Sequence, residues 1–253
     1  MIKHIFFDLD HTIWDFDRNA HETLTELYGQ YKLYDLGLQS CDDFISTYTT
    51  HNHQLWAQYH LGKISKAELR AERFKKTFIE LGIAPEKVPP QFEDDYVNIS
   101  PTKTNLFGGA TEVLSYLQEK YHLHIISNGF KETTLTKMHL SGLNPYFKNV
   151  FISEDVGVNK PDKAIFAHAL SKADAQIHES IMIGDSLEAD IRGAQNFGMI
   201  GAAFGLGLEK SISGFFPVKC AGKLNCKGCF LKLSKRSFAF NSPDCFLSNK
   251  YEV

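Results

Sequence analysis

The sequence lacks any long apolar run. None of its stretches reaches the ~18–20 uncharged apolar residues of a membrane-spanning helix. The first ten residues, MIKHIFFDLD, carry acidic side chains where a signal peptide would be apolar. We therefore expect a cytoplasmic protein with no membrane partner.

An excess of positive charge is also missing. The 253 residues include 27 Lys and Arg against 30 Asp and Glu, which gives a formal net charge of −3. This balance provides no general attraction to nucleic acid, so we expect no nucleic-acid partner. With 43% hydrophobic residues the chain has ample material for a buried core, which excludes overall disorder.

Cysteine is nearly absent from most of the chain. Residues 1–208 contain only Cys41, whereas the last 45 residues contain four cysteines. The same 45 residues hold eight Lys and Arg but only three Asp and Glu, a basic balance that the preceding residues do not share. The segment 209–253 therefore differs in composition from the rest.

Short apolar runs alternate with helical patterns over most of the sequence. This alternation predicts right-handed crossovers and a parallel sheet covered on both faces, an α/β fold with a Rossmann-like core. The strongest strand patterns cover residues 2–10, 122–128 and 180–185, and weaker ones cover 149–153 and 199–204. Helical patterns cover 111–121, 131–141, 162–172 and 186–197.

The region between the first two strong strands departs from this alternation. Its apolar spacing predicts four helices, of which the third is the best defined because Ser65 and Glu68 form a capping box and Gly82 ends it. We expect residues 1–16 and 101–208 to form the core and residues 17–100 to form an inserted helical cap domain.

Four polar motifs follow strands, where open α/β sheets bind ligands. Taken singly, each also fits an ordinary turn or helix cap. Their order and spacing together are highly specific. The adjacent carboxylates of the first motif repel unless a cation or a shared proton intervenes, which indicates a metal, and the backbone N–H groups of the second motif suit phosphate oxygens. The motifs are DLDHT at 8–12, SNG at 127–129, KP at 160–161 and GDSLEAD at 184–190.

These four motifs resemble those of phosphatases of the haloacid dehalogenase superfamily, and the resemblance spans residues 1 to about 208. The inserted helices resemble the small helical cap of one branch of that superfamily. Within it, DLDHTIWDFDRNA, SNGF and SEDVGVNKP are most similar to the bacterial house-cleaning pyrimidine 5′-nucleotidase group.

The resemblance implies roles for the acidic residues. Asp8 would be the nucleophile that forms an aspartyl-phosphate, and Asp10 would protonate the leaving oxygen and later activate water. Mg²⁺ would be held by Asp8, by the backbone carbonyl of Asp10 and by Asp185.

The resemblance also implies roles for the remaining polar residues. Ser127 and the backbone of Asn128 would hold phosphoryl oxygens, and Lys160 would neutralise charge on Asp8 and on the phosphate. Asp190 would orient Lys160 or a metal-bound water.

The function predicted on this basis is Mg²⁺-dependent hydrolysis of a small phosphorylated metabolite, a nucleoside 5′-monophosphate in the first instance. A sugar-phosphate or phosphoglycolate phosphatase and a phosphomutase are alternatives that would use the same site. A non-enzymatic alternative is a nucleic-acid-binding scaffold with a zinc-binding tail.

Two interpretations of residues 209–253 stay open. A shifted reading frame would abolish apolar periodicity and change composition at one point, as observed. A zinc module would instead use four thiolates, but only one pair has the usual two-residue spacing. The cysteines concerned are Cys220, Cys226, Cys229 and Cys245.

Overall fold

A computed structural model describes residues 1–204 and, beyond them, three strands at 215–217, 230–234 and 237–240. The chain divides into two compact units. The first comprises Met1–Ile13, Phe107–Ser127 and Pro145–Val253, and the second comprises Trp14–Leu106 and Asn128–Asn144. We call them the sheet unit and the helical unit.

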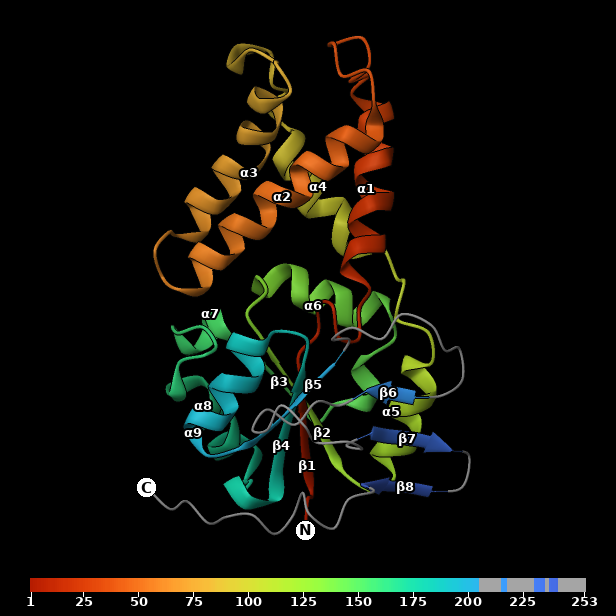
Figure 1. Cartoon of the computed structure of the whole chain (residues 1–253), viewed down its shortest axis with the longest axis vertical. Coiled ribbons are helices and arrows are strands. Elements are labelled where there is room, and N and C mark those ends of the chain that lie inside the picture. The colour runs from red at the N-terminus through yellow and green to blue at the C-terminus, as the bar shows by residue number, and fades with distance from the viewer. Residues whose placement is uncertain (205–214, 218–229, 235–236, 241–253) are drawn as a thin grey trace. The chain divides into compact units, whose positions relative to one another are not determined.

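The sheet unit contains a five-stranded parallel sheet in the order β3-β2-β1-β4-β5 (Figure 1). The predicted α/β fold is thereby confirmed, and each of the five predicted strands is present. Their bounds are β1 His4–Phe7, β2 His122–Ser127, β3 Asn149–Ile152, β4 Ser180–Gly184 and β5 Ile200–Ala203.

Alternate side chains of the central strand enter two different layers, as the pleat of a β-strand requires. Phe6 packs with Met182 and with Phe166 of helix α8. Phe7 points the other way and lines an apolar pocket with Leu114 of helix α5. In Figure 1, α8 and α5 lie on opposite sides of the sheet. The helices of this unit are α5 Ala110–Gln118, α7 Ser153–Val156, α8 Lys163–Ala173 and α9 Gly193–Phe197.

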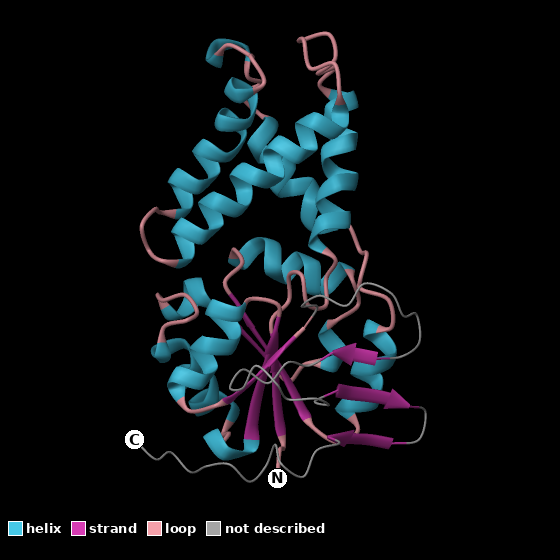
Figure 2. Ribbon diagram, in the orientation of Figure 1, coloured by secondary structure: helices cyan, strands magenta, loops and turns pink. Residues whose placement is uncertain are grey.

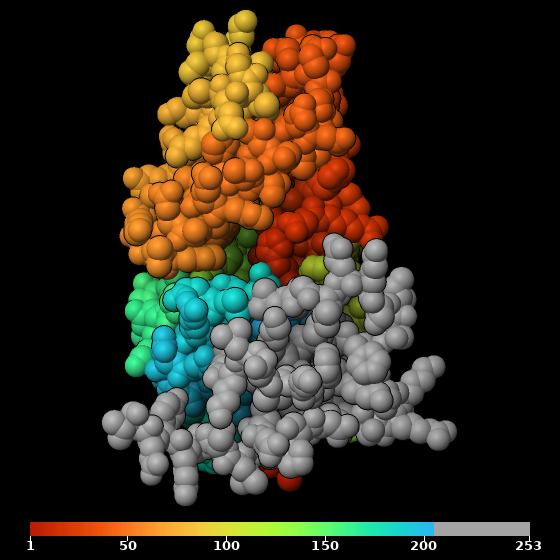
Figure 3. Space-filling model, in the orientation of Figure 1, coloured from red at the N-terminus to blue at the C-terminus, as the bar shows by residue number. Residues whose placement is uncertain are grey.

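The helical unit contains five α-helices, besides two short 3₁₀ turns. Figure 2 draws helices in cyan. The first four of these helices and their connections enclose a core of aromatic and aliphatic side chains, among them Phe44, Phe78 and Phe92. Side chains of α2 and α3 form a continuous outer surface in the space-filling view of Figure 3. The helices are α1 Phe16–Gln30, α2 Cys41–His60, α3 Lys66–Glu80, α4 Phe92–Ile99 and α6 Lys131–Leu140.

Two local features bear on the sequence expectations. The predicted capping box at the start of α3 is present, with Ser65 and Glu68 each accepting a backbone hydrogen bond from the other. Helix α6 groups with the helical unit, although the sequence assigned it to the core. The prediction followed the order of elements along the chain, whereas the units are defined by contacts in space, and these place Asn128–Asn144 with the helical unit.

Beyond residue 204 the structure describes an antiparallel sheet of β6 Phe215–Pro217, β7 Phe230–Ser234 and β8 Ser237–Phe240. The four tail cysteines of the zinc hypothesis lie outside the described residues. Among the residues that are described, no helix is both long enough and apolar enough to cross a bilayer.

Candidate active site

The carboxyl ends of three adjacent strands carry the first, second and fourth motifs. In the parallel register Phe7 of β1 lies opposite Ile125 of β2 and Ile183 of β4. Asp8 therefore follows β1 at the edge where β2 ends in Ser127 and where β4 ends in Gly184. Its backbone N–H donates to the carbonyl of Ile183 at 2.8 Å, which extends the ladder by one bond.

Lys160 joins two of these carboxylates. Its Nζ donates to Asp8 Oδ1 at 2.6 Å, to Asp190 Oδ1 at 2.6 Å and to the carbonyl of Ile126 at 2.7 Å. An ammonium group has three N–H bonds, so these acceptors satisfy its donors. The Lys160 side chain is only 2% exposed, which makes the ion pairs charge-assisted contacts in a dry setting.

Asp190 is held in place by an unusual helical turn. The predicted helix over 186–197 is present as a π-helical turn at Leu187–Arg192 followed by α9. The Ser186 carbonyl accepts from Asp190 N at 3.0 Å and from Ile191 N at 3.2 Å. The Ser186 N–H in turn donates to Asp190 Oδ2 at 3.0 Å. Because the other oxygen meets Lys160, the Asp190 carboxylate is fixed at both ends.

Two glycines permit this close packing. A Cβ on Gly184 would overlap the carboxylate of Asp190. A Cβ on Gly193 would lie 2.9 Å from Cβ of Pro161, the residue that follows Lys160. Only glycine fits at either position without displacing the Lys160 and Asp190 segments.

Burial and charge shift the pKa values of the cluster. Desolvation raises the pKa of Asp8 well above its ordinary value, although Lys160 acts in the opposite direction. Desolvation and the nearby Asp190 likewise raise the pKa of Asp185. For Lys160, burial alone would lower the pKa, but the carboxylates of Asp190 and Asp8 outweigh it and raise the pKa. The lysine therefore stays charged among carboxylates that burial destabilises.

The carboxylates of Asp8, Asp185 and Asp190 offer oxygens that all lie within 4.8 Å of one another. Lys160 pairs with two of these three acidic groups, Asp8 and Asp190, so the carboxylates of the cluster outnumber its paired ammonium. A hard divalent cation with oxygen ligands matches this donor set. Since Asp190 is already bonded through both oxygens, Asp8 and Asp185 are the side chains best suited to hold such a cation.

Asp10 lies three residues beyond the end of β1 at Phe7, in a β-bridge position just before the turn at residues 11–13. The N–H groups of Thr12 and Ile13 donate to the Leu9 carbonyl, and His11 has a positive φ of 60°. Leu9 is fully buried and Asp10 is partly exposed, and the Asp10 carboxylate is not part of the three-carboxylate group. Its acid–base role and the role of its carbonyl remain predictions.

The SNG motif spans the boundary between the two units. Ser127 ends β2 and is 1% exposed, and Asn128, which is 6% exposed, belongs to the helical unit. Their predicted contacts with phosphoryl oxygens remain proposals.

Sequence reasoning missed the parts of the site that depend on close packing. Gly184 and Gly193 were not predicted to make room for Asp190 and Pro161, and the π-helical turn was not expected. The available signal was Gly184, which directly precedes Asp185 in the GDSLEAD motif, but many loops contain such a glycine.

The family model for hydrolases of the haloacid dehalogenase-like type matches residues 2–198. The chain therefore belongs to the haloacid dehalogenase-like hydrolase family and is a hydrolase.

Named relatives give this membership more detail. The chain is 36% identical over 200 residues to the pyrimidine 5′-nucleotidase PynA of Streptococcus pneumoniae, covering 78% of this chain and 81% of that protein. It is 32% identical to the pyrimidine 5′-nucleotidase YjjG of Escherichia coli, covering 77% and 82%.

A solved structure supports the same assignment. The putative HAD-hydrolase YfnB of Bacillus subtilis, solved bound to magnesium, matches with a TM-score of 0.70 and 31% identity. The match covers 79% of this chain and 87% of that chain.

Proposed function

We propose that this hydrolase cleaves phosphomonoesters through a covalent phosphate on Asp8, with Mg²⁺, and that its substrates are nucleoside 5′-monophosphates. The observation that carries the proposal is the buried Asp8–Lys160–Asp190 chain of 2.6 Å contacts beside Asp185. A carboxylate held by a lysine at the end of a central strand is suited to attack an electrophile that carries negative charge.

The first step transfers the phosphoryl group to the protein. An oxygen of the Asp8 carboxylate forms a bond to phosphorus as the bond from phosphorus to the ester oxygen breaks. Asp10 donates its proton to that departing oxygen, so an alcohol leaves. Lys160, whose ammonium contacts Asp8, counters negative charge on the attacking carboxylate and on the phosphoryl group.

The second step frees Asp8. Water attacks phosphorus and gives a proton to the Asp10 carboxylate, the bond between phosphorus and the Asp8 oxygen breaks, and inorganic phosphate forms. Ser127 and the backbone N–H of Asn128 would hold phosphoryl oxygens during both steps. Asp190 keeps Lys160 in place throughout through its 2.6 Å contact.

Mg²⁺ fits this arrangement because its ligands would all be oxygens. Asp8 and Asp185, with the carbonyl of Asp10, would hold it. When bound, it shields the phosphate dianion from the attacking carboxylate and neutralises charge that develops in the transition state. The magnesium-bound structure of YfnB supports this part of the proposal.

The nucleotide preference rests on the relatives. Two proteins named as pyrimidine 5′-nucleotidases match at 36% and 32% identity over most of the chain. A sugar phosphate would require the same phosphate chemistry but a different pocket for the leaving group.

A panel of phosphorylated compounds tests the proposal. The purified protein with Mg²⁺ is incubated with pyrimidine and purine 5′-monophosphates, hexose phosphates, phosphoglycolate and p-nitrophenyl phosphate, and phosphate release is measured. We expect the highest kcat/KM for a nucleoside 5′-monophosphate. A higher value for a hexose phosphate or phosphoglycolate would overturn the substrate assignment, and no turnover of any ester would overturn the proposed reaction.

A further inference from the structure

Helix α6 begins with an unusual residue. Phe130 occupies its N-cap position, where Ser, Thr, Asp and Asn are preferred because their side chains accept a hydrogen bond from the first turn. The Phe130 side chain makes no such bond. Its carbonyl accepts from Thr134 N at 2.8 Å and from Thr133 Oγ1 at 3.0 Å. The helix thus begins at Lys131 without the capping contribution of a polar N-cap side chain.

The ring of Phe130 is instead buried between α2 and α3, and only 3% of the residue is exposed. It packs in one cluster with Leu55 of α2 and Leu69 of α3. The rings of Trp56 and Tyr59 lie 5.1 Å and 5.9 Å from it, centroid to centroid. These distances are typical of favourable aromatic pairs.

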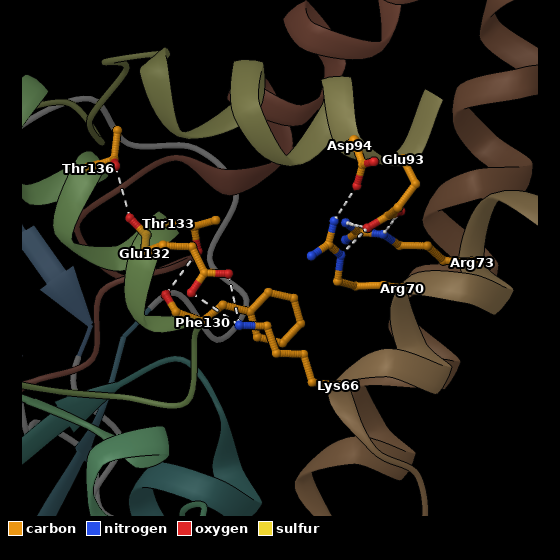
Figure 4. Close-up of polar contacts among 9 residues, drawn as sticks. All are labelled: Lys66, Arg70, Arg73, Glu93, Asp94, Phe130, Glu132, Thr133 and Thr136. Carbon is orange, nitrogen blue, oxygen red and sulfur yellow. Dashed lines mark hydrogen bonds and ion pairs between the residues drawn. The ribbon is translucent and has the colours of Figure 1, made fainter. Parts of the chain in front are cut away.

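An ion pair reinforces the same junction (Figure 4). Lys66, the first residue of α3, donates from Nζ to both carboxylate oxygens of Glu132, at 2.8 Å and 3.1 Å. The same Nζ lies 4.4 Å from the centre of the Phe130 ring, a cation–π distance. A lysine is unfavourable in the first turn of a helix, where the macrodipole favours acids, so its placement here is explained by Glu132.

Phe130 directly follows the turn that carries the proposed phosphate-binding groups. Three peptide bonds separate Ser127 from Phe130, so the two Cα atoms are at most about 11 Å apart. Asn128 and Gly129 are therefore tethered on both sides, by the end of β2 at Ser127 and by the buried Phe130 ring.

From this arrangement we infer that Phe130 is a positioning residue for the turn at 127–129, and that the Lys66–Glu132 pair holds Phe130 in its seat. The inference rests on the proposed function for its consequence in catalysis. A fixed turn presents the Ser127 hydroxyl and the Asn128 N–H in one geometry. A loosened turn binds phosphoryl oxygens less well, in the substrate and in the product.

The first experiment compares Phe130→Leu with Phe78→Leu. Phe78 is also a buried aromatic residue of the helical unit, but it belongs to a different cluster. We expect Phe130→Leu to lower kcat/KM about 10- to 100-fold, because misplacing a binding group by about 1 Å has an effect of that size. Its inhibition constant for inorganic phosphate should rise. Phe78→Leu should lower the melting temperature and leave the inhibition constant unchanged.

The second experiment uses the ion pair. Lys66→Met and Glu132→Gln should each lower kcat/KM about two- to fivefold, and the double variant should be no worse than either, since one interaction is lost in all three. Lys103→Met is the matched control, because Lys103 pairs with Glu26 at 2.6 Å. The exposures of the two pairs are similar: 23% for Lys103 and 49% for Glu26, against 29% for Lys66 and 54% for Glu132.

Hydrogen exchange of peptides covering 127–130 separates this inference from the proposed function. Exchange should rise about 10-fold in Phe130→Leu and not in the controls, whether or not the protein hydrolyses phosphate esters. Unchanged exchange with unchanged phosphate inhibition would overturn the inference. Raised exchange in a protein that turns over no phosphomonoester would overturn the proposed function alone.

Discussion

Each of the two units contains a cluster of charged side chains around one buried cation, Arg73 or Lys160, and the clusters differ in their charge balance. In the helical unit, Arg73 forms two bonds with Glu93, at 2.8 Å and 2.7 Å, while Arg70 bonds to Glu93 at 3.0 Å and to Asp94 at 2.7 Å (Figure 4). Two guanidinium groups thus meet two carboxylates.

The cluster of the sheet unit is not balanced. Among the described residues, the three grouped carboxylates of Asp8, Asp185 and Asp190 are paired with one lysine, Lys160, which bonds to Asp8 and Asp190. A buried ion pair with matched charges can persist as part of a folded core, whereas surplus buried charge is unstable without a further cation. The difference shows which of the two clusters is suited to bind a ligand and which is suited to hold helices together.

Replacing the proposed nucleophile of the sheet-unit cluster should cause the largest loss of activity. Asp8→Asn keeps the side-chain shape but removes the attacking oxygen, so phosphatase activity should fall by at least about 10⁴-fold. Stability should not decrease much, because one of three mutually repelling carboxylates is neutralised. Steady-state kinetics and a thermal melt measure both. Near-wild-type turnover in a folded sample would contradict the covalent mechanism.

Removing divalent cations should act on the sheet unit alone. Chelation followed by dialysis should abolish activity, and Mg²⁺ should restore it, whereas Ca²⁺ should inhibit because it favours higher coordination numbers. Mg²⁺ should also raise the melting temperature of the wild type, but not of Asp185→Asn. Full turnover in excess EDTA would exclude the metal site.

Breaking the balanced cluster should reduce stability and spare chemistry. Arg73→Met leaves Glu93 with Arg70 as its partner, so the free energy of unfolding should fall by about 3 kcal/mol, the low end for a broken buried pair. Urea denaturation measures this loss. Turnover per folded molecule should match the wild type, and a specific loss of kcat would show that this cluster also serves the reaction.

Close packing around Asp190 allows a test of whether the position of its carboxylate matters for activity. Gly184→Ala introduces a Cβ that overlaps the Asp190 carboxylate, which would shift it away from Lys160. We expect kcat/KM to fall about 10²-fold. Gly108→Ala is the matched control, since a Cβ there meets nothing within 4 Å. Equal activities for the two variants would show that the position of Asp190 is unimportant.

The buried histidines His4 and His124 of the sheet unit should have the smallest effect, a change of folding stability with pH. His124 Nε2 lies 3.1 Å from His4 Nδ1, and His124 Nδ1 lies 3.1 Å from Asn149 Nδ2. Burial lowers the pKa of His124 to about 3 from the ordinary 6.5. The unfolded chain therefore binds more protons between pH 6.5 and 3, so stability falls as pH falls through this window.

The expected loss from His124 at pH 5 is at most about 2 kcal/mol relative to pH 7. Denaturation midpoints at pH 7, 6 and 5 measure it, and His124→Leu should flatten the profile. A wild-type midpoint that is constant across this range would refute the assignment.

The strands and the motifs could be predicted because their signals are local. A strand such as Ser180–Gly184 is a short apolar run that ends at a polar residue, and its bounds nearly match the prediction. The capping box of Ser65 and Glu68 depends on residues three apart, so it too can be recognised without a fold.

The sequence by itself determined the α/β architecture and indicated the inserted helices, because periodicity is a property of neighbouring residues. It also supplied the candidate site residues, whose catalytic roles stay predictions. The contacts of Lys160 with Asp8 and Asp190 were expected from the family resemblance, and the tertiary structure gave their geometry. Only the tertiary structure decided that Arg73 is buried against Glu93. It also placed Phe130 between α2 and α3. These contacts join residues from 20 to more than 150 positions apart, and their geometry depends on how the elements pack.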